Sequence, residues 1–277
     1  MLPSSRFLGL PVSFWSYVRS ISEWVGYSKA GAVLKYDQKQ AIFKLKNNGI
    51  DTEELETSGS GNHLLQVLEE YFAFRADLLT TKVRSNLMNG AEAKELFDSY
   101  RSQHPLLKAP LPMNKQKLEM SHVNYLTGLV NIVTEASLGG YHFNGSPGTL
   151  AVMLKDKKPV TTMSRRLDGA YPTTVNPIAV WEVKEYYDNK SFGSRIADGV
   201  YETLLDGYEL RNLYQETGIK VWHYLILDSF NTWWKLGIPY LCRLVDAMHM
   251  GLVDEVVVGK EVVTRWPEIV HSWLPGK

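Results

Sequence analysis

The sequence predicts an α/β fold, in which a mixed central sheet is flanked by helices and is preceded by a helical N-terminal region. Two observations support this prediction. From residue 12 to about residue 103, apolar residues recur every three or four positions, which is the period of a helix that buries one face. Further along the chain, short β-branched or apolar runs alternate with segments of helical period. Such alternation is typical of a sheet covered by helices.

A proline-rich stretch separates these two patterns. "HPLLKAPLPMNK" spans residues 104–115 and cannot continue a helix, because proline lacks the amide hydrogen that a helix interior requires. We therefore predict a helical region over residues 1–110 and an α/β core over residues 111–277. Within the helical region, the polar stretch "ETSGSGN" at residues 56–62 is expected to separate two groups of helices.

The elements of the core follow from changes of period. Residues 117–140 predict a helix that ends at a pair of glycines. The runs "TLAVML", "VTTM" and "IAVWEV" predict a meander of three strands over residues 149–183. A helix is then expected at 194–218, a strand at 219–228, a helix at 238–251 and a strand at 254–259. This order predicts a mixed sheet with helices on both faces.

The composition excludes several classes of protein. The chain has 30 lysines and arginines against 30 aspartates and glutamates, so any binding of a polyanion must come from local clusters of charge. Its single cysteine excludes an intramolecular disulfide and a cysteine-rich zinc site. No apolar run approaches the roughly 20 residues that cross a bilayer, and residues 1–20 lack the pattern of a signal peptide. We expect a cytoplasmic protein without a membrane partner.

An acid followed two residues later by lysine occurs five times, and one copy stands apart. Glu182 and Lys184 end an apolar run, so strand alternation places both side chains on one face. Asp168 lies at the end of the preceding predicted strand, where strand pairing brings it beside Glu182. Two adjacent carboxylates suit a hard cation such as Mg²⁺. Lys184 would orient an attacking water or stabilise charge on the phosphorane.

This arrangement resembles the PD-(D/E)xK nuclease superfamily. The resemblance rests on Asp168-Gly169, on Glu182-Val183-Lys184 in the next strand and on the helix and strand that follow, and it covers about residues 117–227. It implies a restriction-endonuclease-like core, in which Asp168 and Glu182 bind a Mg²⁺ ion and Lys184 assists the attacking water. The superfamily's motif has a proline before the aspartate, where this chain has Leu167.

The resemblance also implies a further acidic residue on the helix before the meander. Glu135 is the candidate, because it lies one turn before the glycine pair on a helix that should pack against the sheet. Glu119, near the start of the same helix, is the second candidate. The alternative for Glu135 is a solvent-facing helix residue without a catalytic role.

Two clusters of basic residues predict contacts with DNA. Residues 26–51 resemble a helix-turn-helix, with a first helix through Ala32, Val33 and Tyr36. The second helix would present Lys39, Gln40, Lys44 and Lys46 to bases and phosphates. A loop and turn next to the predicted metal site contribute Lys157, Lys158, Arg165 and Arg166 as phosphate contacts. The alternatives are a solvated helix face and a lysine-rich turn that keeps a hairpin soluble.

The sequence therefore predicts a Mg²⁺-dependent endonuclease that cleaves duplex DNA, most similar to a type II restriction endonuclease. Cleavage of a palindromic duplex requires two sites related by a two-fold axis, so we expect a homodimer. A structure-selective repair nuclease or a defence nuclease of the same superfamily is an alternative. A non-catalytic DNA-binding regulator that uses the helix-turn-helix is another. No phosphate-binding glycine loop and no serine-esterase motif is present in the sequence.

Overall fold

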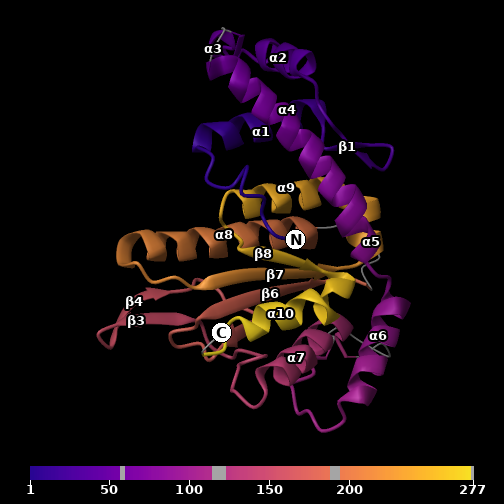
Figure 1. Cartoon of the computed structure of the whole chain (residues 1–277), viewed down its shortest axis with the longest axis vertical. Coiled ribbons are helices and arrows are strands. Elements are labelled where there is room, and N and C mark those ends of the chain that lie inside the picture. The colour runs from indigo at the N-terminus through magenta and orange to yellow at the C-terminus, as the bar shows by residue number, and fades with distance from the viewer. Residues whose placement is uncertain (57–59, 114–122, 188–193, 276–277) are drawn as a thin grey trace.

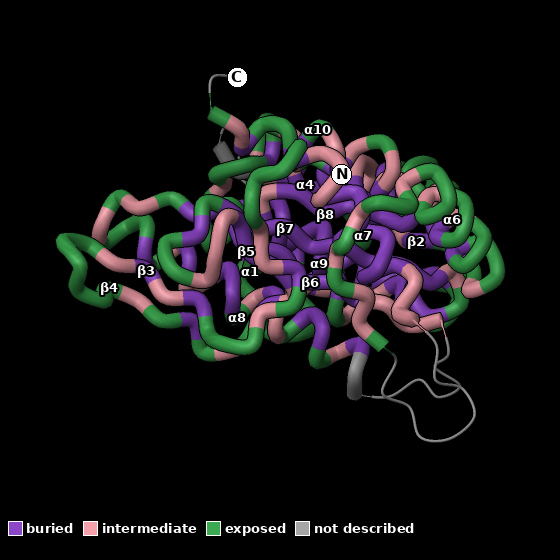
Figure 2. The backbone as a smooth tube through the Cα atoms, turned by 90° about the horizontal axis from the view of Figure 1, so that it is seen from below, coloured by how far each residue is buried: buried purple, intermediate pink, exposed green. Residues whose placement is uncertain are grey.

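The computed structural model describes residues 1–56, 60–113, 123–187 and 194–275. A group of N-terminal helices stands over a body built around a sheet, with helices above and below it (Figure 1). The most buried backbone runs through this sheet and the helices that cover it, whereas the hairpin at the sheet's edge is largely exposed (Figure 2).

The central sheet has the order β5-β6-β7-β8. Strand β5 (Gly169–Tyr171) is antiparallel to β6 (Ala179–Glu185), and β6, β7 (Trp222–Asp228) and β8 (Glu255–Val258) are parallel. Every residue of β6 except the last is buried, as in a central strand that is covered on both faces. The predicted mixed sheet is confirmed.

Helices cover both faces of this sheet. Helices α8 (Ser194–Thr217) and α9 (Ile238–His249) lie on one face, and α7 (Tyr125–Leu138) and α10 (Arg265–His271) lie on the other (Figure 1). Along β7, Leu225 and Leu227 pack in the cluster that includes α9, while Ile226 packs with α7 and α10. The strand's period of two thus divides the apolar core into two layers. The sequence did not predict α10.

The N-terminal region is mainly helical, as predicted. It contains α1 (Val12–Val25), α2 (Gln38–Asn47), α3 (Glu53–Glu56) and α4 (Ser60–Leu78), and α4 continues through a π-helical turn (Leu79–Val83) into α5 (Arg84–Asn86). These helices bury a cluster of their own. Leu79 and Val83 also pack in the same cluster as Trp233 and Met248, which joins the region to the core.

The predicted first helix of the helix-turn-helix is wrong. A β-hairpin of β1 (Ser28–Lys29) and β2 (Ala32–Val33) takes its place, and Tyr36 follows this hairpin outside any helix or strand. The two residues between these strands, Ala30 and Gly31, both have a positive φ, of 50° and 77°. A tight two-residue hairpin turn needs this left-handed backbone, and glycine adopts it at little cost.

The three predicted strands of the meander are present, but they do not form one meander. Strands β3 (Val152–Lys155) and β4 (Lys158–Thr162) form a separate two-stranded sheet beside the central one, closed by a turn at Asp156 and Lys157. Strand β5 then pairs with β6 as an additional strand. Its three residues are too few to show a period in the sequence.

Helix α6 (Gly90–Gln103) packs on the core, although it precedes the prolines at which we placed the boundary. Asn89 caps this helix, since its side chain accepts the amide hydrogens of Ala91 and Glu92. Phe97 of α6 is 2% exposed and packs in the same cluster as Leu126 and Leu129 of α7. The chain therefore joins the core before the proline-rich stretch.

Candidate active site

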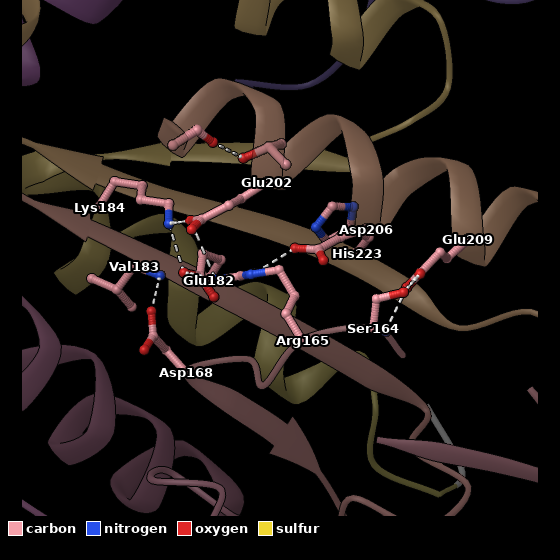
Figure 3. Close-up of polar contacts among 12 residues, drawn as sticks. Ser164, Arg165, Asp168, Glu182, Val183, Lys184, Glu202, Asp206, Glu209 and His223 are labelled. Carbon is pink, nitrogen blue, oxygen red and sulfur yellow. Dashed lines mark hydrogen bonds and ion pairs between the residues drawn. The ribbon is translucent and has the colours of Figure 1, made fainter. Parts of the chain in front are cut away.

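Asp168 lies directly before β5, opposite Glu182 and Val183 of β6 (Figure 3). Its amide hydrogen bonds the Trp181 carbonyl at 3.1 Å, and its Oδ2 accepts the Val183 amide hydrogen at 2.8 Å. The strand pairing predicted to bring Asp168 beside Glu182 is therefore present. The hydrogen bond from Val183 also fixes the direction of the Asp168 carboxylate.

The glycine after Asp168 is required by close packing. A Cβ atom on Gly169 would lie 1.9 Å from an indole carbon of Trp181. Trp181 is fully buried and pairs with Gly169 across the two strands. Any larger residue at position 169 would push β5 away from β6 and with it Asp168. The Asp-Gly dipeptide thus holds the carboxylate against the neighbouring strand.

Glu182 and Lys184 lie on the same face of β6, as strand alternation predicted. Lys184 Nζ donates a hydrogen bond to Glu182 Oε1 at 2.7 Å. The two residues are only 4% and 6% exposed. A buried charge persists only when it is paired and hydrogen-bonded, and each of these two side chains supplies the other with an opposite charge.

Arg165 brings helix α8 into the site. From the segment between β4 and β5, its Nη2 contacts Glu182 Oε1 at 2.6 Å and Glu202 Oε2 at 3.3 Å, while its Nη1 contacts Asp206 Oδ2 at 2.7 Å (Figure 3). Glu202 also accepts a hydrogen bond from Lys184. Two cations and three carboxylates therefore form one connected network between β6 and α8.

A cavity of about 660 Å³ opens beside this network. Its walls come from the segment before β5, from β6, from the start of α7 and from the loop at residues 145–147. The charged residues that line it are Asp168, Glu182, Lys184 and Glu185. Three of the four predicted catalytic residues, Asp168, Glu182 and Lys184, thus line one cavity.

The carboxyl groups of this site differ in their ionisation. Burial, followed by the nearby charge of Glu182, raises the pKa of Asp168 to about 7. Burial also acts to raise the pKa of Glu182, but Lys184 and Arg165 outweigh it and hold that pKa below its ordinary value. Burial alone would lower the pKa of Lys184, but Glu182, Tyr186 and Glu202 raise it. At neutral pH Glu182 is ionised and Lys184 is protonated.

The residues present fit a Mg²⁺ ion. Asp168 and Glu182 line the same cavity, and Glu182 Oε2 is buried without a hydrogen-bond partner among the described residues. Mg²⁺ prefers oxygen ligands and commonly takes one or two carboxylates while keeping several waters. Within the described part of the chain, no group of three or more acidic, histidine or cysteine side chains is arranged to hold a metal. The candidate ligands are therefore this pair.

Glu135 lies apart from the cavity. Its Oε1 accepts the amide hydrogen of Lys108, and it is not among the residues that line the cavity of Asp168. Glu119 falls outside the described residues. Instead of supplying an acid, α7 binds Glu185 of β6. Glu185 Oε2 accepts both the amide and the hydroxyl hydrogens of Thr127 at 3.1 Å. Glu185 thus ties the end of β6 to the first turn of α7.

The predicted DNA-binding residues lie in three places. Lys39, Gln40 and Lys46 are exposed on α2, with Lys44 half-buried, and α2 lies at the far end of the N-terminal helices, away from the sheet (Figure 1). Lys157 and Lys158 are exposed at the turn of the β3–β4 hairpin. Arg166 is exposed, whereas its neighbour Arg165 is engaged by three carboxylates.

The contribution of α8 to the site was not predicted from the sequence. Glu202 and Asp206 are four residues apart on a helix that was correctly predicted, so both lie on one face of it. Asp206 is fully buried, and burial raises its pKa to about 7. An acidic pair at this spacing, on the helix that follows Lys184, was the signal that could have identified these residues.

Comparisons with known proteins identify families of unknown function. A family model described as "Domain of unknown function (DUF7687)" matches residues 88–273, and a second, "Domain of unknown function (DUF7690)", matches residues 1–82. The first range begins just before α6. No curated protein and no solved structure matches the chain. Among the described helices, none combines the length and the apolar character needed to span a membrane.

Proposed function

We propose that this chain, which belongs to the DUF7687 family, is a Mg²⁺-dependent endonuclease that hydrolyses phosphodiester bonds of duplex DNA. The observation that carries the proposal is one cavity lined by Asp168, Glu182 and Lys184. The sequence pattern selects these three residues, and the pairing of β5 with β6 brings them close together although they come from separate segments. The finer proposal is a cytoplasmic homodimer that cuts at a specific sequence, as type II restriction enzymes do.

In this proposal Asp168 and Glu182 hold the ion. A bound Mg²⁺ would supply Lewis-acid charge to the hydrolysis. Lys184 and Arg165 keep Glu182 ionised, because both donate to its Oε1. The Val183 amide orients the Asp168 carboxylate. Each ligand is therefore positioned by the fold before any substrate binds.

In this proposal Lys184 acts as a positively charged hydrogen-bond donor and not as a general base. Its pKa is raised because Glu182, Tyr186 and Glu202 outweigh the effect of burial, so it remains an ammonium at neutral pH. A protonated lysine cannot accept a proton from water, but it can orient the attacking water and stabilise the negative charge that develops on the phosphorane. Exposed Arg166, Lys157 and Lys158 would contact the phosphates of the duplex.

Digestion of a plasmid of known sequence tests the proposal. The wild-type protein is incubated with Mg²⁺ or with EDTA, and the fragment ends are sequenced. We expect cleavage only with Mg²⁺, and a rate at least about 100-fold lower for Asp168→Asn and for Lys184→Met, because each removes a charge that acts on the transition state. The matched control is Lys94→Ala, since Glu92 and Lys94 have the same acid-x-lysine spacing on a helix.

The outcomes separate the alternatives. Discrete fragments with constant ends support a sequence-specific restriction enzyme, whereas ends scattered over many sequences support a repair or defence nuclease. Full cleavage by both Asp168→Asn and Lys184→Met would overturn the site assignment. Absence of cleavage by the wild type, together with retained binding to one DNA sequence, would favour a non-catalytic DNA-binding protein.

A further inference from the structure

Arg165 has a different environment from the exposed arginine next to it. The Arg165 side chain is 20% exposed, and its two terminal nitrogens contact carboxylates of β6 and of α8. The partner in α8 that lies deepest is Asp206, whose side chain is fully buried. A guanidinium engaged in this way has little capacity left for a phosphate group. The neighbouring Arg166 remains exposed.

The contacts of Arg165 restrict one carboxylate in particular. Glu182 Oε1 accepts a hydrogen bond from Arg165 at 2.6 Å and another from Lys184 at 2.7 Å. Rotation of this carboxylate would break at least one of the two. Oε2 is left without a partner among the described residues. The orientation of Glu182, which leaves Oε2 without a partner, therefore depends on Arg165 as well as on Lys184.

Helix α8 holds Arg165 in turn. Asp206 fixes Nη1 and Glu202 contacts Nη2, so the planar guanidinium is held on two sides (Figure 3). The two terminal nitrogens of Arg165 contact different carboxylates at the same time, whereas a lysine at this position would present a single ammonium. We name Arg165, Glu202 and Asp206 the α8 clamp.

We infer that Arg165 is a positioning residue for Glu182, held in place by Asp206 of the α8 clamp, and that it is not a phosphate contact. This inference rests on the proposed function of the site. Residues that orient a metal ligand from behind commonly change metal affinity or activity by about 10- to 100-fold when they are replaced. The structure assigns that position to a residue that the sequence had grouped with the DNA contacts.

The experiment compares Arg165→Met with its neighbour Arg166→Met in two measurements. DNA binding is followed by fluorescence anisotropy in EDTA at several salt concentrations, and cleavage is followed against Mg²⁺ concentration. For Arg165→Met we expect unchanged DNA affinity and salt dependence, with a half-saturating Mg²⁺ concentration or a cleavage rate altered by about 10- to 100-fold. For Arg166→Met we expect weaker binding, a shallower salt dependence and an unchanged Mg²⁺ requirement.

Two further variants test the connection to α8. Asp206→Asn should change the Mg²⁺ requirement in the same direction as Arg165→Met, and the double variant should be no worse than Arg165→Met alone, because both changes break one chain of contacts. Arg165→Lys keeps the charge but presents a single ammonium, so we expect incomplete recovery. It also replaces Arg165→Met if that variant fails to fold.

The proposed nuclease function and the proposed role of Arg165 can fail separately. A wild-type protein that does not cleave DNA overturns the proposed function, and the α8 clamp is then judged by denaturant unfolding, which requires no activity. Free energies of unfolding that are additive for Arg165→Met and Asp206→Asn would overturn the clamp. It would also be overturned if Arg165→Met lost DNA affinity and salt dependence while the Mg²⁺ requirement stayed the same.

Discussion

Two arginines anchor buried charge clusters in this protein, and the clusters differ in their balance. Arg75 of α4 is fully buried and contacts both oxygens of Asp246 in α9 at 3.0 and 3.1 Å. Its other terminal nitrogen donates to the Ser22 hydroxyl of α1, and the Tyr71 hydroxyl donates to Asp246 at 2.6 Å. One positive charge meets one negative charge, and Arg75 Nε alone of the three guanidinium nitrogens has no hydrogen-bond partner among the described residues.

The cluster around Arg165 is not balanced in this way. Arg165 and Lys184 face the carboxylates of Glu182, Glu202 and Asp206, and Asp168 lies beside them. Carboxylates outnumber cations, Glu182 Oε2 has no partner among the described residues, and a cavity adjoins them. The Arg75 cluster therefore joins the N-terminal helices to the core, whereas the Arg165 cluster borders a cavity and is the cluster at which we propose a bound Mg²⁺ ion.

The largest expected effect on stability is that of Arg75→Met. This change leaves Asp246 buried without its opposite charge, so we expect the free energy of unfolding to fall by about 3–5 kcal/mol. Arg165→Met should cost less, because Arg165 is 20% exposed and Lys184 still pairs with Glu182. Urea unfolding of both variants measures the difference. Equal losses of unfolding free energy in the two variants would contradict the distinction between the Arg75 cluster and the Arg165 cluster.

A double variant serves as the control for this prediction. Arg75→Met combined with Asp246→Leu removes both charges, and replacement of a whole buried ion pair by apolar residues is often far less costly than removal of one partner. We therefore expect the double variant to recover part of the stability lost in Arg75→Met. A loss in the double variant equal to the sum of the single losses would show that the charges act independently.

The second prediction uses the pH dependence of the Arg165 cluster. Burial raises the pKa of Asp206 to about 7, from an ordinary value near 4. Between these two values the folded protein binds one more proton than the unfolded chain, so the contribution of Asp206 to stability falls as the pH rises from about 4 to 7. Asp206→Asn cannot titrate, so this part of the pH dependence should disappear. Unfolding of both proteins at several pH values measures it.

One outcome would contradict the raised pKa of Asp206. A stability difference between the wild type and Asp206→Asn that stayed constant from pH 4 to pH 8 would show that Asp206 has no raised pKa. Asp206 would then be ionised near neutral pH, and the network would carry more negative charge there than a pKa of about 7 allows.

The smallest effect is expected at an exposed ion pair. Lys94 and Asp98 lie one turn apart on α6, and their side chains are 56% and 52% exposed. Exposed pairs are screened by water and contribute little to stability. Lys94→Ala should therefore unfold at the same denaturant concentration as the wild type and cleave DNA at the same rate. A clear loss of stability would mean that exposure does not separate the weak from the strong charge pairs here.

The sequence alone predicted the helices and strands that are long enough to show a regular pattern of apolar residues. The helices α8 and α9 and the strands β6, β7 and β8 were predicted within a few residues of their ends, because each buries a regular set of apolar side chains. The same alternation correctly placed Glu182 and Lys184 on one face. The short elements were missed or misassigned, since β1, β2 and β5 each have only two or three residues.

Tertiary structure alone decided which of the charged residues meet. Arg165 and Arg166 are equivalent in sequence, yet one is bound to α8 and the other is exposed. Glu135 was the predicted further acid, yet it does not line the cavity, whereas Glu185, which was not predicted, lines it beside α7. The period of a segment determines its own buried face, but the partners of a polar side chain depend on segments distant in sequence. Only the folded chain brings these segments together.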